Sequence, residues 1–350
     1  MIAPTSTYLT RMLGAGLATT LIAGAFALAT RPQEERVIPT ATIVMTHVPE
    51  PAITPARVQE VTPPVPMSKD IHLVFKAGGA SWIKLASLET LPRHGKPVLA
   101  EDDYQSSAIA RVADDKVPDA HARWIGKHVT VDGGCRATIT GFAVIARLTG
   151  EPGYAGIESV NDKWTAPAVF EHGAKMLAAK LDNCAGGSYA RESAYSNVIV
   201  PLAIEDEPLA AAAVTSLKAS PEASGAQTEW TEYSQPGIWH QNEYATTQTM
   251  VLRHPMTGAT WVSVHMQYSG GCGLPNINVW GLYRTDADGK LVRVKSSLGD
   301  IVQIEKIVDV DGDGELEVIG RPWLGTDRAI QGADGTTLDT LELPYFMCPC

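Results

Sequence analysis

The stretch CRATITGFAVIARL, residues 135–148, is long and rich in β-branched and other apolar residues. This composition is typical of a β-strand. Two shorter stretches before it have the same character: IHLVFK at residues 71–76 and SWIKLA at residues 81–86. The sequence therefore predicts a folded body that contains several strands and begins near residue 70.

Two helices are predicted downstream of this strand. The first follows Thr165, has a proline near its first turn, and ends before the Gly186-Gly187 pair. Its apolar positions fall at helical spacing: Val169, Phe170, Gly173, Met176, Leu177 and Leu181. The second begins at Asp206 and Pro208. Its apolar face comprises Leu209, Ala213, Val214 and Leu217. Residues 70–217 are therefore expected to form a mixed half of strands and helices.

The pattern changes after residues 218–227, which are polar and predict a break between the helical region and the strands that follow. Residues 261–268 then alternate strictly between apolar and polar side chains, as a half-buried strand does. Residues 277–284 and 290–294 flank an Asp-Ala-Asp-Gly turn, which is typical of a β-hairpin. These features predict an antiparallel sheet from Tyr244 to the C-terminus.

The predicted fold class is α+β. A mixed strand and helix half, residues 70–217, is expected to pack against a β-rich, mainly antiparallel half, residues 218–350. Before them, residues 1–29 form a signal peptide or membrane anchor and residues 30–69 a proline-rich linker.

Acidic residues alternate in the sequence DVDGDGELE at residues 309–317, which we call the acidic loop. Calcium is a hard cation that takes about six to eight oxygen ligands, so its sites bring several carboxylates together on a tight loop. Gly314 permits such a turn. The candidate ligands are Asp309, Asp311, Asp313, the backbone carbonyl of Glu315, and Glu317. The sequence therefore predicts a Ca²⁺ site in this loop.

The flanks of the acidic loop distinguish it from an EF-hand. An EF-hand has a glutamate at the twelfth position and a helix on each side. The twelfth position here is Gly320, and the flanking residues are β-branched and alternating, which predicts a strand–loop–strand site. The loop resembles the calcium loops of FG-GAP or VCBS-type repeats. The resemblance implies a bound Ca²⁺, but those families repeat the unit many times and this chain has one copy, so a propeller is not expected.

More loosely, the body from residue 70 resembles uncharacterised exported proteins of myxobacterial type. The resemblance is carried by residues 140–150, by residues 320–325 and by the closing LPYFMCPC. It implies export and a unified fold, and it implies no particular chemistry.

A second interpretation of the acidic loop is a polar turn that binds nothing, since aspartate and glycine are good turn residues. Three converging carboxylates without a cation repel one another, which favours a metal site over a simple turn. No base or nucleophile lies next to the loop in the sequence, so a structural ion is expected rather than a catalytic one.

Five cysteines lie in the body: Cys135, Cys184, Cys272, Cys348 and Cys350. In an oxidising compartment they would form disulfides. Pairing Cys135 with Cys184, and Cys272 with one of the two terminal cysteines, would keep each bridge within one half of the body. One thiol remains, either free or paired with a second chain, and the connectivity stays open.

The N-terminus carries an export signal. Residues 12–29 are apolar and uncharged after a single basic residue, Arg11, and end in Ala27-Leu28-Ala29, the small-x-small pattern of a cleavage site. An uncleaved membrane anchor is the alternative. Seven prolines in residues 37–69 then predict a semi-rigid spacer. An anchor, a spacer and a terminal domain together resemble the layout of TonB-type envelope proteins.

The composition limits the partners. The net charge of −11 argues against nucleic acid, because phosphates would repel the chain. A membrane is expected as a partner only if the N-terminal segment stays uncleaved. The ligand or envelope partner is not identified. The expected location is the periplasm, the cell surface or the extracellular space.

The sequence assigns no catalytic residue. It contains no G-x-S-x-G, no phosphate-binding glycine loop and no H-E-x-x-H. His265, on the polar face of a predicted strand, is interpreted as an ordinary surface histidine. Five tryptophans fall in the second half: Trp230, Trp239, Trp261, Trp280 and Trp323. Most are expected in the core, and any exposed together would form a platform for sugars or an aromatic peptide groove.

Three readings of function follow. The first is an exported, non-enzymatic binding or structural module that contains disulfides and a structural calcium site. The second is an exported hydrolase with dispersed catalytic residues, which would show a turnover abolished by one Asp, Glu or His substitution. The third is a TonB-like tether, which would retain its N-terminal segment in the mature protein.

Overall fold

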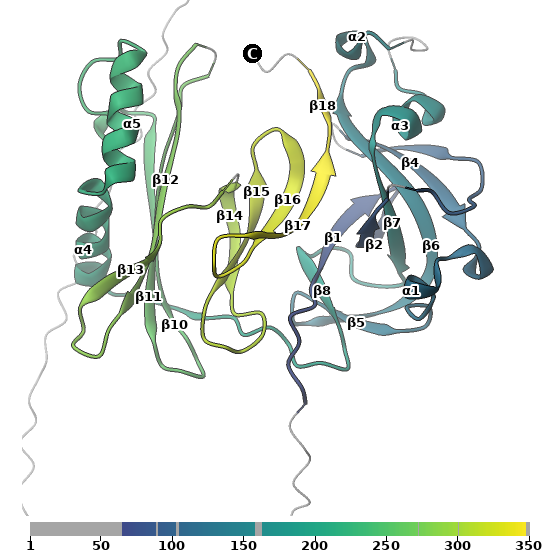
Figure 1. Cartoon of the computed structure of the whole chain (residues 1–350), viewed down its shortest axis with the longest axis horizontal. Coiled ribbons are helices and arrows are strands. Elements are labelled where there is room, and N and C mark those ends of the chain that lie inside the picture. The colour runs from purple at the N-terminus through teal and green to yellow at the C-terminus, as the bar shows by residue number, and fades with distance from the viewer. Residues whose placement is uncertain are drawn as a thin grey trace, which may run out of the picture. The chain divides into compact units, whose positions relative to one another are not determined.

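The fold is taken from a computed structural model that describes residues 65–88, 90–102, 105–157, 163–271, 273–299 and 301–347. These residues belong to one compact unit that contains three sheets (Figure 1). The signal or anchor segment, nearly all of the linker, and Cys272, Cys348 and Cys350 lie outside them. No helix of the described residues is both long and apolar enough to cross a membrane.

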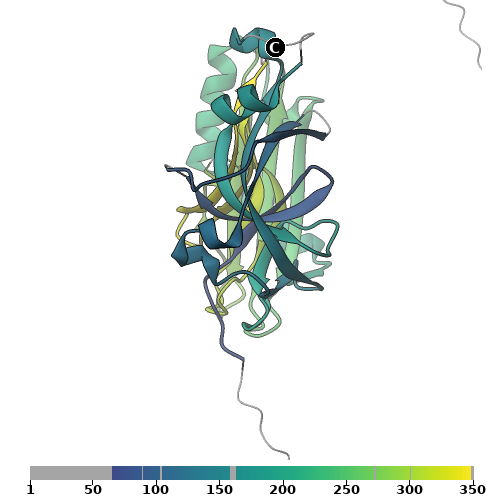
Figure 2. The same ribbon diagram turned by 90° about the vertical axis from the view of Figure 1, so that its right-hand side faces the viewer.

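The first sheet has nine strands. They are β1 (His72–Ala77), β2 (Ala80–Ser87), β3 (Val98–Asp102), β4 (Gln105–Val112), β5 (His128–Val131), β6 (Cys135–Gly150), β7 (Ala174–Leu181), β8 (Tyr189–Glu192) and the short β18 (Tyr345–Phe346). The pairings β6–β5, β5–β8, β8–β1, β1–β2, β2–β7 and β7–β6 form a closed antiparallel circuit. We call this circuit the barrel. The barrel strands cross in front in Figure 2.

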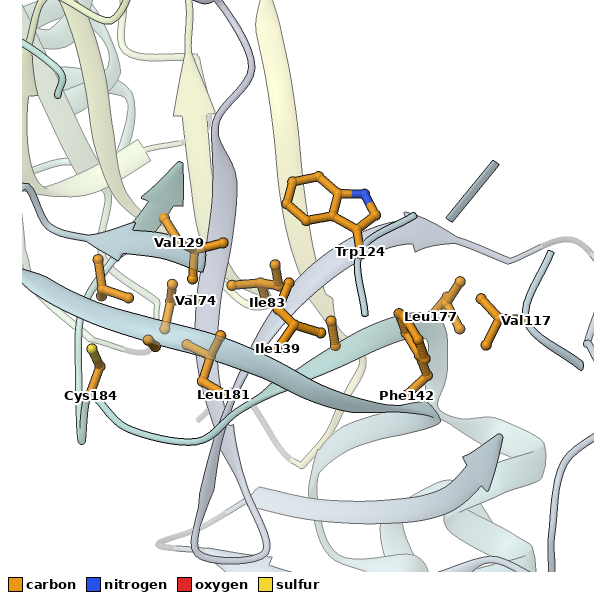
Figure 3. Close-up of a cluster of buried hydrophobic side chains, with 14 of the residues drawn as sticks. Val74, Ile83, Val117, Trp124, Val129, Ile139, Phe142, Leu177, Leu181 and Cys184 are labelled. Carbon is orange, nitrogen blue, oxygen red and sulfur yellow. The ribbon is translucent and has the colours of Figure 1, made fainter. Parts of the chain in front are cut away.

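Apolar side chains from these strands fill the barrel. The cluster includes Val74, Val129, Ile139 and Leu181, which are each at most 4% exposed. Figure 3 shows their side chains gathered between the strands, with Cys184 at one side of the group. Because successive residues of a strand point to opposite faces, strands such as β6 place one set of apolar residues inside the barrel and another outside.

Short helical segments lie in the connections between the strands of this sheet. They are η1 (Asp114–Lys116), α1 (Asp119–Ala122), α2 (Pro152–Ala155) and α3 (Ala166–His172). The Thr165 hydroxyl accepts a hydrogen bond from the Ala168 amide and caps the start of α3.

The second sheet has five antiparallel strands, in the order β13-β12-β11-β10-β9. Their bounds are β9 (Leu202–Ile204), β10 (Ala245–Arg253), β11 (Thr260–Ser269), β12 (Asn276–Thr285) and β13 (Leu291–Lys295). One face packs against α4 (Glu207–Lys218) and α5 (Pro221–Glu232) through a core that includes Val264, Met266 and Trp230. The 3-10 turn η2 (Trp239–Gln241) leads into β10.

The third sheet has four antiparallel strands: β14 (Ile301–Val308), β15 (Glu317–Pro322), β16 (Gly325–Gln331) and β17 (Thr337–Leu343). One of its cores, with Val318 and Leu316, also contains Trp261 and Trp280 of the five-stranded sheet. Its other core, with Ile319 and Ile330, is shared with the outside of the barrel. The four-stranded sheet is therefore the layer between the other two, as Figure 1 shows.

The sheet-rich architecture is compatible with the predicted α+β class, and several local predictions are confirmed. The strand at residues 135–148 is β6, the hairpin around the Asp-Ala-Asp-Gly turn is β12–β13, and the second helix is α4, capped by Asp206. The division into two halves is not confirmed. The four-stranded sheet shares a core with the barrel, and β18 pairs with β6.

The first predicted helix is wrong beyond residue 172. Helix α3 ends at His172, and residues 174–181 form strand β7 between β2 and β6. A side chain at Gly173 would lie 2.6 Å from the Val169 carbonyl and 2.8 Å from that of Arg147, so the chain turns where only glycine fits. Strand β7 is apolar on both faces, because Leu177 faces the barrel core and Met176 the outer core, and this obscured its alternation.

Two further predictions are wrong. Residues 218–227 are not a break, because α5 begins at Pro221, capped by the Ser220 hydroxyl, and buries Ala223, Ala226 and Trp230. The region from Tyr244 onward is not one sheet. Strands β10–β13 and β14–β17 belong to two sheets that pack face to face, since each must cover an apolar side, and β18 pairs with β6.

Candidate metal site

The acidic loop connects β14 to β15, so strands flank it on both sides, as predicted. At its start, Asp309 and Ile199 exchange two backbone hydrogen bonds of 2.8 Å each. Gly312 and Gly314 have φ angles of 78° and 88°, in the left-handed region that favours glycine. The alternation of acids with glycine therefore serves the backbone of the loop as well as its charge.

The three aspartates come together. One carboxylate oxygen from each of Asp309, Asp311 and Asp313 lies within 4.8 Å of the others. Asp309 is fully buried, Asp311 is partly buried and Asp313 is exposed, so the cluster runs from the interior to the surface. This confirms that the predicted aspartates form one group that could hold a metal ion.

Backbone amides preorganise the cluster. Oδ1 of Asp309 accepts from the Gly312 amide at 2.6 Å, and its Oδ2 accepts from the Gly314 amide at 2.9 Å. Oδ1 of Asp313 accepts from the Glu315 amide at 2.8 Å. Within the described part of the chain, no protein group hydrogen-bonds Oδ2 of Asp313, so this oxygen is available to a ligand.

Glu317 completes the acidic surface. It is 7% exposed, and its Oε2 accepts from the Val310 amide at 2.8 Å. Burial and the charges of the three aspartates outweigh that hydrogen bond and raise the pKa of Glu317 to about 7. Burial, with the charges of the aspartates added to it, thus favours a proton on Glu317 near neutral pH, and a cation bound at the loop would favour the ionised form instead.

A cavity of about 260 Å³ lies over the loop, lined by Asp311, Asp313, Glu317 and Asp334. Asp334 comes from the turn between β16 and β17. The Lys295 ammonium, largely buried, donates to the Gly332 carbonyl on the same cavity wall, and burial lowers the pKa of Lys295. The cavity therefore receives carboxylates from two loops of the four-stranded sheet.

His254 supports the loop from behind. Both His254 and Asp309 are fully buried, and Nε2 of His254 lies 2.9 Å from Oδ2 of Asp309. Nδ1 accepts hydrogen bonds from the amides of Met256 and Thr257. Since Nδ1 is an acceptor, the proton of the neutral ring resides on Nε2 and is donated to Asp309. The β10–β11 turn is thereby bonded to the acidic loop.

The chain that enters the body crosses the front of the loop. Lys69 donates to Oδ2 of Asp311 at 2.9 Å, and this hydrogen bond raises the pKa of the ammonium. Burial alone would raise the pKa of Asp311, but the bond to Lys69 makes the net shift downward. Arg191, 2% exposed, donates to the carbonyls of Ser68 and Val310, both at 2.5 Å, and so joins the entering segment to the loop.

One predicted ligand, Glu315, is not part of the aspartate cluster through its side chain. The side chain of Glu315 pairs with Arg284 at 3.0 Å on the surface, and its carbonyl as a calcium ligand stays a prediction. Sequence reasoning missed His254, Lys69 and Asp334. They are distant in the sequence, and only the pairing of strands brings them to the loop.

The donor set fits a hard divalent cation. Oδ2 of Asp313 and Oε1 of Glu317 accept no hydrogen bond from the described residues. Lys69 holds Oδ2 of Asp311, and the Asp313 amide donates to its Oδ1 at 3.4 Å. All the donors are oxygens, the ligands that Ca²⁺ takes. His254 is excluded as a ligand, because both of its ring nitrogens are already engaged.

The calcium-free protein is expected to lose stability as the pH rises from about 5 to 8. The native state holds a proton on Glu317 up to its pKa of about 7, whereas the unfolded chain releases it near 4.5. The raised pKa of Glu317 therefore stabilises the native state at pH values below the pKa of the unfolded chain. This contribution, at most about 3 kcal/mol, is lost as the pH rises through the pKa of the folded protein. Urea unfolding in chelator at both pH values measures it.

Glu317→Gln is the matched variant for this measurement, because it removes the titrating group and keeps the shape. We expect it to be less sensitive to pH than the parent over this interval. An equal pH dependence in both proteins would contradict the assignment.

The Cys135–Cys184 disulfide, with 5.8 Å between the Cα atoms, is present as predicted. It joins the start of β6 to the loop after β7, since Cys184 follows a strand and not a helix. The proposed bridge from Cys272 to the C-terminus lies outside the described residues.

Comparison of the chain with protein-family models, with curated proteins and with solved structures finds no match.

Proposed function

We propose that the chain is an exported, non-enzymatic binding or structural module whose four-stranded sheet is stabilised by a Ca²⁺ ion in the acidic loop. The observation that carries the proposal is the grouping of Asp309, Asp311 and Asp313, of which Asp311 and Asp313 line one small cavity together with Glu317, whose pKa is raised to about 7. A divalent cation would neutralise the charge that the loop cannot compensate by itself.

Calcium suits the site better than softer or smaller cations. The loop offers only oxygen donors, which disfavours metals that prefer thiolate or imidazole. Its aspartates range from the fully buried Asp309 to the exposed Asp313. Ca²⁺ accepts such irregular coordination, whereas Mg²⁺ demands a near-ideal octahedron.

A structural role follows from what the loop touches. It is bonded to the β10–β11 turn through His254, and to the segment before β1 through Lys69 and Arg191. Ile199, between the barrel and the five-stranded sheet, is paired with its first residue. An ion in this place would hold contacts from distant parts of the chain together.

The disulfide supports export. Disulfides persist in oxidising compartments and are rare in the cytosol. The Cys135–Cys184 bridge is compatible with the export signal expected from residues 1–29. The periplasm, the cell surface and the extracellular space all satisfy this condition and supply calcium.

Thermal unfolding in calcium and in chelator tests the proposed function. A ligand at about 100 times its dissociation constant stabilises by about 2.7 kcal/mol. For a unit of this size we expect the midpoint to rise by roughly 5 °C in calcium. Asp313→Asn, which keeps the size of an exposed side chain, should lose most of the rise.

Asp115→Asn is the control, because Asp115 is an exposed aspartate at the barrel that already pairs with Lys116. It should retain the full calcium effect. An unchanged midpoint in calcium for the parent protein would show that the acidic loop is a turn without an ion.

Removing the Lys69 ammonium is expected to tighten calcium binding. Lys69 occupies an oxygen of Asp311 that a cation would otherwise use, so it competes with the ion. Lys69 is well exposed, so we expect a modest gain for Lys69→Ala, about 2-fold to 5-fold in affinity. Calcium titration at low ionic strength measures it.

Lys116→Ala provides the comparison, since Lys116 is also an exposed lysine with an aspartate partner, 2.6 Å away. It should bind calcium like the parent. Weaker binding in Lys69→Ala would mean that the lysine helps to hold the loop for the ion instead of competing with it.

A further inference from the structure

A second candidate site lies on the five-stranded sheet, on the face toward the four-stranded sheet. Along this face, His265 pairs with Trp280, which is buried in the core between the two sheets. Two residues further along each strand, Thr246, Gln267 and Asn278 lie side by side in the strand register. Residues two apart share a face, so this polar row continues the buried face where the core ends.

The polar row lines a cavity of about 550 Å³. Gly299 and Val302, at the start of β14, line it together with Trp323 from the β15–β16 connection. Tyr244, just before β10, lines it as well. The cavity is a groove open to solvent between two sheets, and its size is within the range of small-molecule sites.

The groove has an unusual chemistry for this protein. Its lining holds aromatic, amide, hydroxyl and aliphatic side chains, and no charged residue among the described ones. Exposed surface normally carries many Lys, Glu, Asp and Arg side chains, and the chain as a whole has a net charge of −11. The uncharged lining of the described residues favours a polar ligand without charge.

Two of the aromatic rings are exposed at the groove. Trp323 is 50% exposed and Tyr244 is 66% exposed, whereas Trp230, Trp239, Trp261 and Trp280 are at most 2% exposed. An indole that is half exposed loses part of the hydrophobic stabilisation that the four buried tryptophans gain. An indole in this position offers a flat apolar face and a polar N–H to a ligand.

The amides of the polar row are already oriented. Nδ2 of Asn278 donates to the Ile301 carbonyl at 2.9 Å, and Nε2 of Gln267 donates to the Val302 carbonyl. Oδ1 of Asn278 accepts from Nε2 of His265 at 2.5 Å. His265 is therefore not the surface histidine expected from the sequence, because it is 3% exposed and holds Asn278 in place. In the described part of the chain, Oε1 of Gln267 keeps no protein donor.

We propose that this groove binds a neutral saccharide. A sugar ring presents C–H groups that pack on exposed aromatic faces, and hydroxyls that pair with fixed amide and hydroxyl groups. A fully apolar ligand would cover Oε1 of Gln267 without giving it a donor, which is costly. An ionic ligand would find no countercharge among the lining residues that the structure describes. The proposal goes beyond the calcium site and does not depend on it.

Calorimetric titration of the whole protein with five neutral oligosaccharides tests the proposal: cellohexaose, maltohexaose, xylohexaose, mannohexaose and hexa-N-acetylchitohexaose. We expect at least one to bind. Trp323→Ala should weaken that binding by about 10-fold or more, since it removes a stacking face. Gln267→Glu should weaken it as well, because it places an unpaired charge in the groove.

Tyr154→Ala is the control, because Tyr154 is an aromatic residue of α2 that is 62% exposed and lies outside the groove. It should bind like the parent. Circular dichroism confirms that each variant is folded, and repeating the titration in chelator separates this site from the calcium loop. The proposal is overturned if none of the five sugars binds, if the two groove variants bind as the parent does, or if tetra-alanine binds in place of the sugars.

Discussion

Replacing His254 with alanine is expected to destabilise the protein by about 3–5 kcal/mol, because the fully buried carboxylate of Asp309 loses its imidazole donor and keeps only the amides of Gly312 and Gly314. The same change removes the acceptor of the Met256 and Thr257 amides and opens a cavity. For a unit of this size, the loss corresponds to a fall in the melting midpoint of roughly 5–10 °C. Thermal and urea unfolding in chelator measure it without the contribution of calcium.

His172→Ala is the matched control for this variant. His172 ends α3, its side chain is 36% exposed, and its carboxylate neighbour lies 3.9 Å away on the surface. We expect it to unfold within about 0.5 kcal/mol of the parent, as surface substitutions usually do. A stability of His254→Ala equal to that of His172→Ala would show that the buried pair does not support the acidic loop.

Loss of the Cys135–Cys184 bridge is the second large effect. The two cysteines are 49 residues apart, and in the chain-entropy model a closed loop of that length stabilises by about 4 kcal/mol. The bridge also ties together β6 and the end of β7, which pair in the barrel. We expect Cys135→Ala/Cys184→Ala to unfold at a clearly lower urea concentration than the parent under oxidising conditions.

Two comparisons make the disulfide prediction specific. A non-reducing digest of the purified native protein should contain one peptide pair joined through Cys135 and Cys184. Each single variant should be destabilised about as much as the double variant, since either change removes the bridge. Free reactivity of both thiols in the native protein under oxidising conditions would contradict the prediction.

The acidic loop was predictable because its signal is local. Alternating aspartates with Gly314, between two β-branched flanks, indicated a strand–loop–strand site, and β14 and β15 confirm those flanks. The same holds for the β12–β13 hairpin, whose turn residues are contiguous. The Cys135–Cys184 pairing was one of several that remained open, and the pairing of β6 with β7 is what brings these two cysteines together.

The features that failed depend on tertiary structure. Residues 174–181 fit a helical spacing as well as a strand that is apolar on both faces, and only their place between β2 and β6 decides between the two. Helix α5 is rich in polar residues and gains its stability by burying Trp230 against the five-stranded sheet. Nothing in the sequence around His254 indicates Asp309, which is 55 residues away.

The acidic loop and the proposed saccharide groove lie at opposite ends of strand β14 of the four-stranded sheet. The loop joins β14 to β15, whereas the groove is lined by the opposite end of β14 and by Trp323 after β15. Rigidity supplied at the loop would therefore act on the same two strands that form one wall of the groove. This arrangement suits a module in which a structural ion supports a separate binding surface.

Calorimetric titration of the metal-free protein with calcium tests the central claim most directly. We predict one Ca²⁺ per chain, with a dissociation constant at or below about 1 mM, the range of extracellular calcium modules. Asp313→Asn combined with Glu317→Gln should weaken the binding by more than about 10-fold, and Lys116→Ala should leave it unchanged. The absence of saturable binding up to about 10 mM calcium, or equal binding by the double variant, would contradict the assignment of the acidic loop as a calcium site.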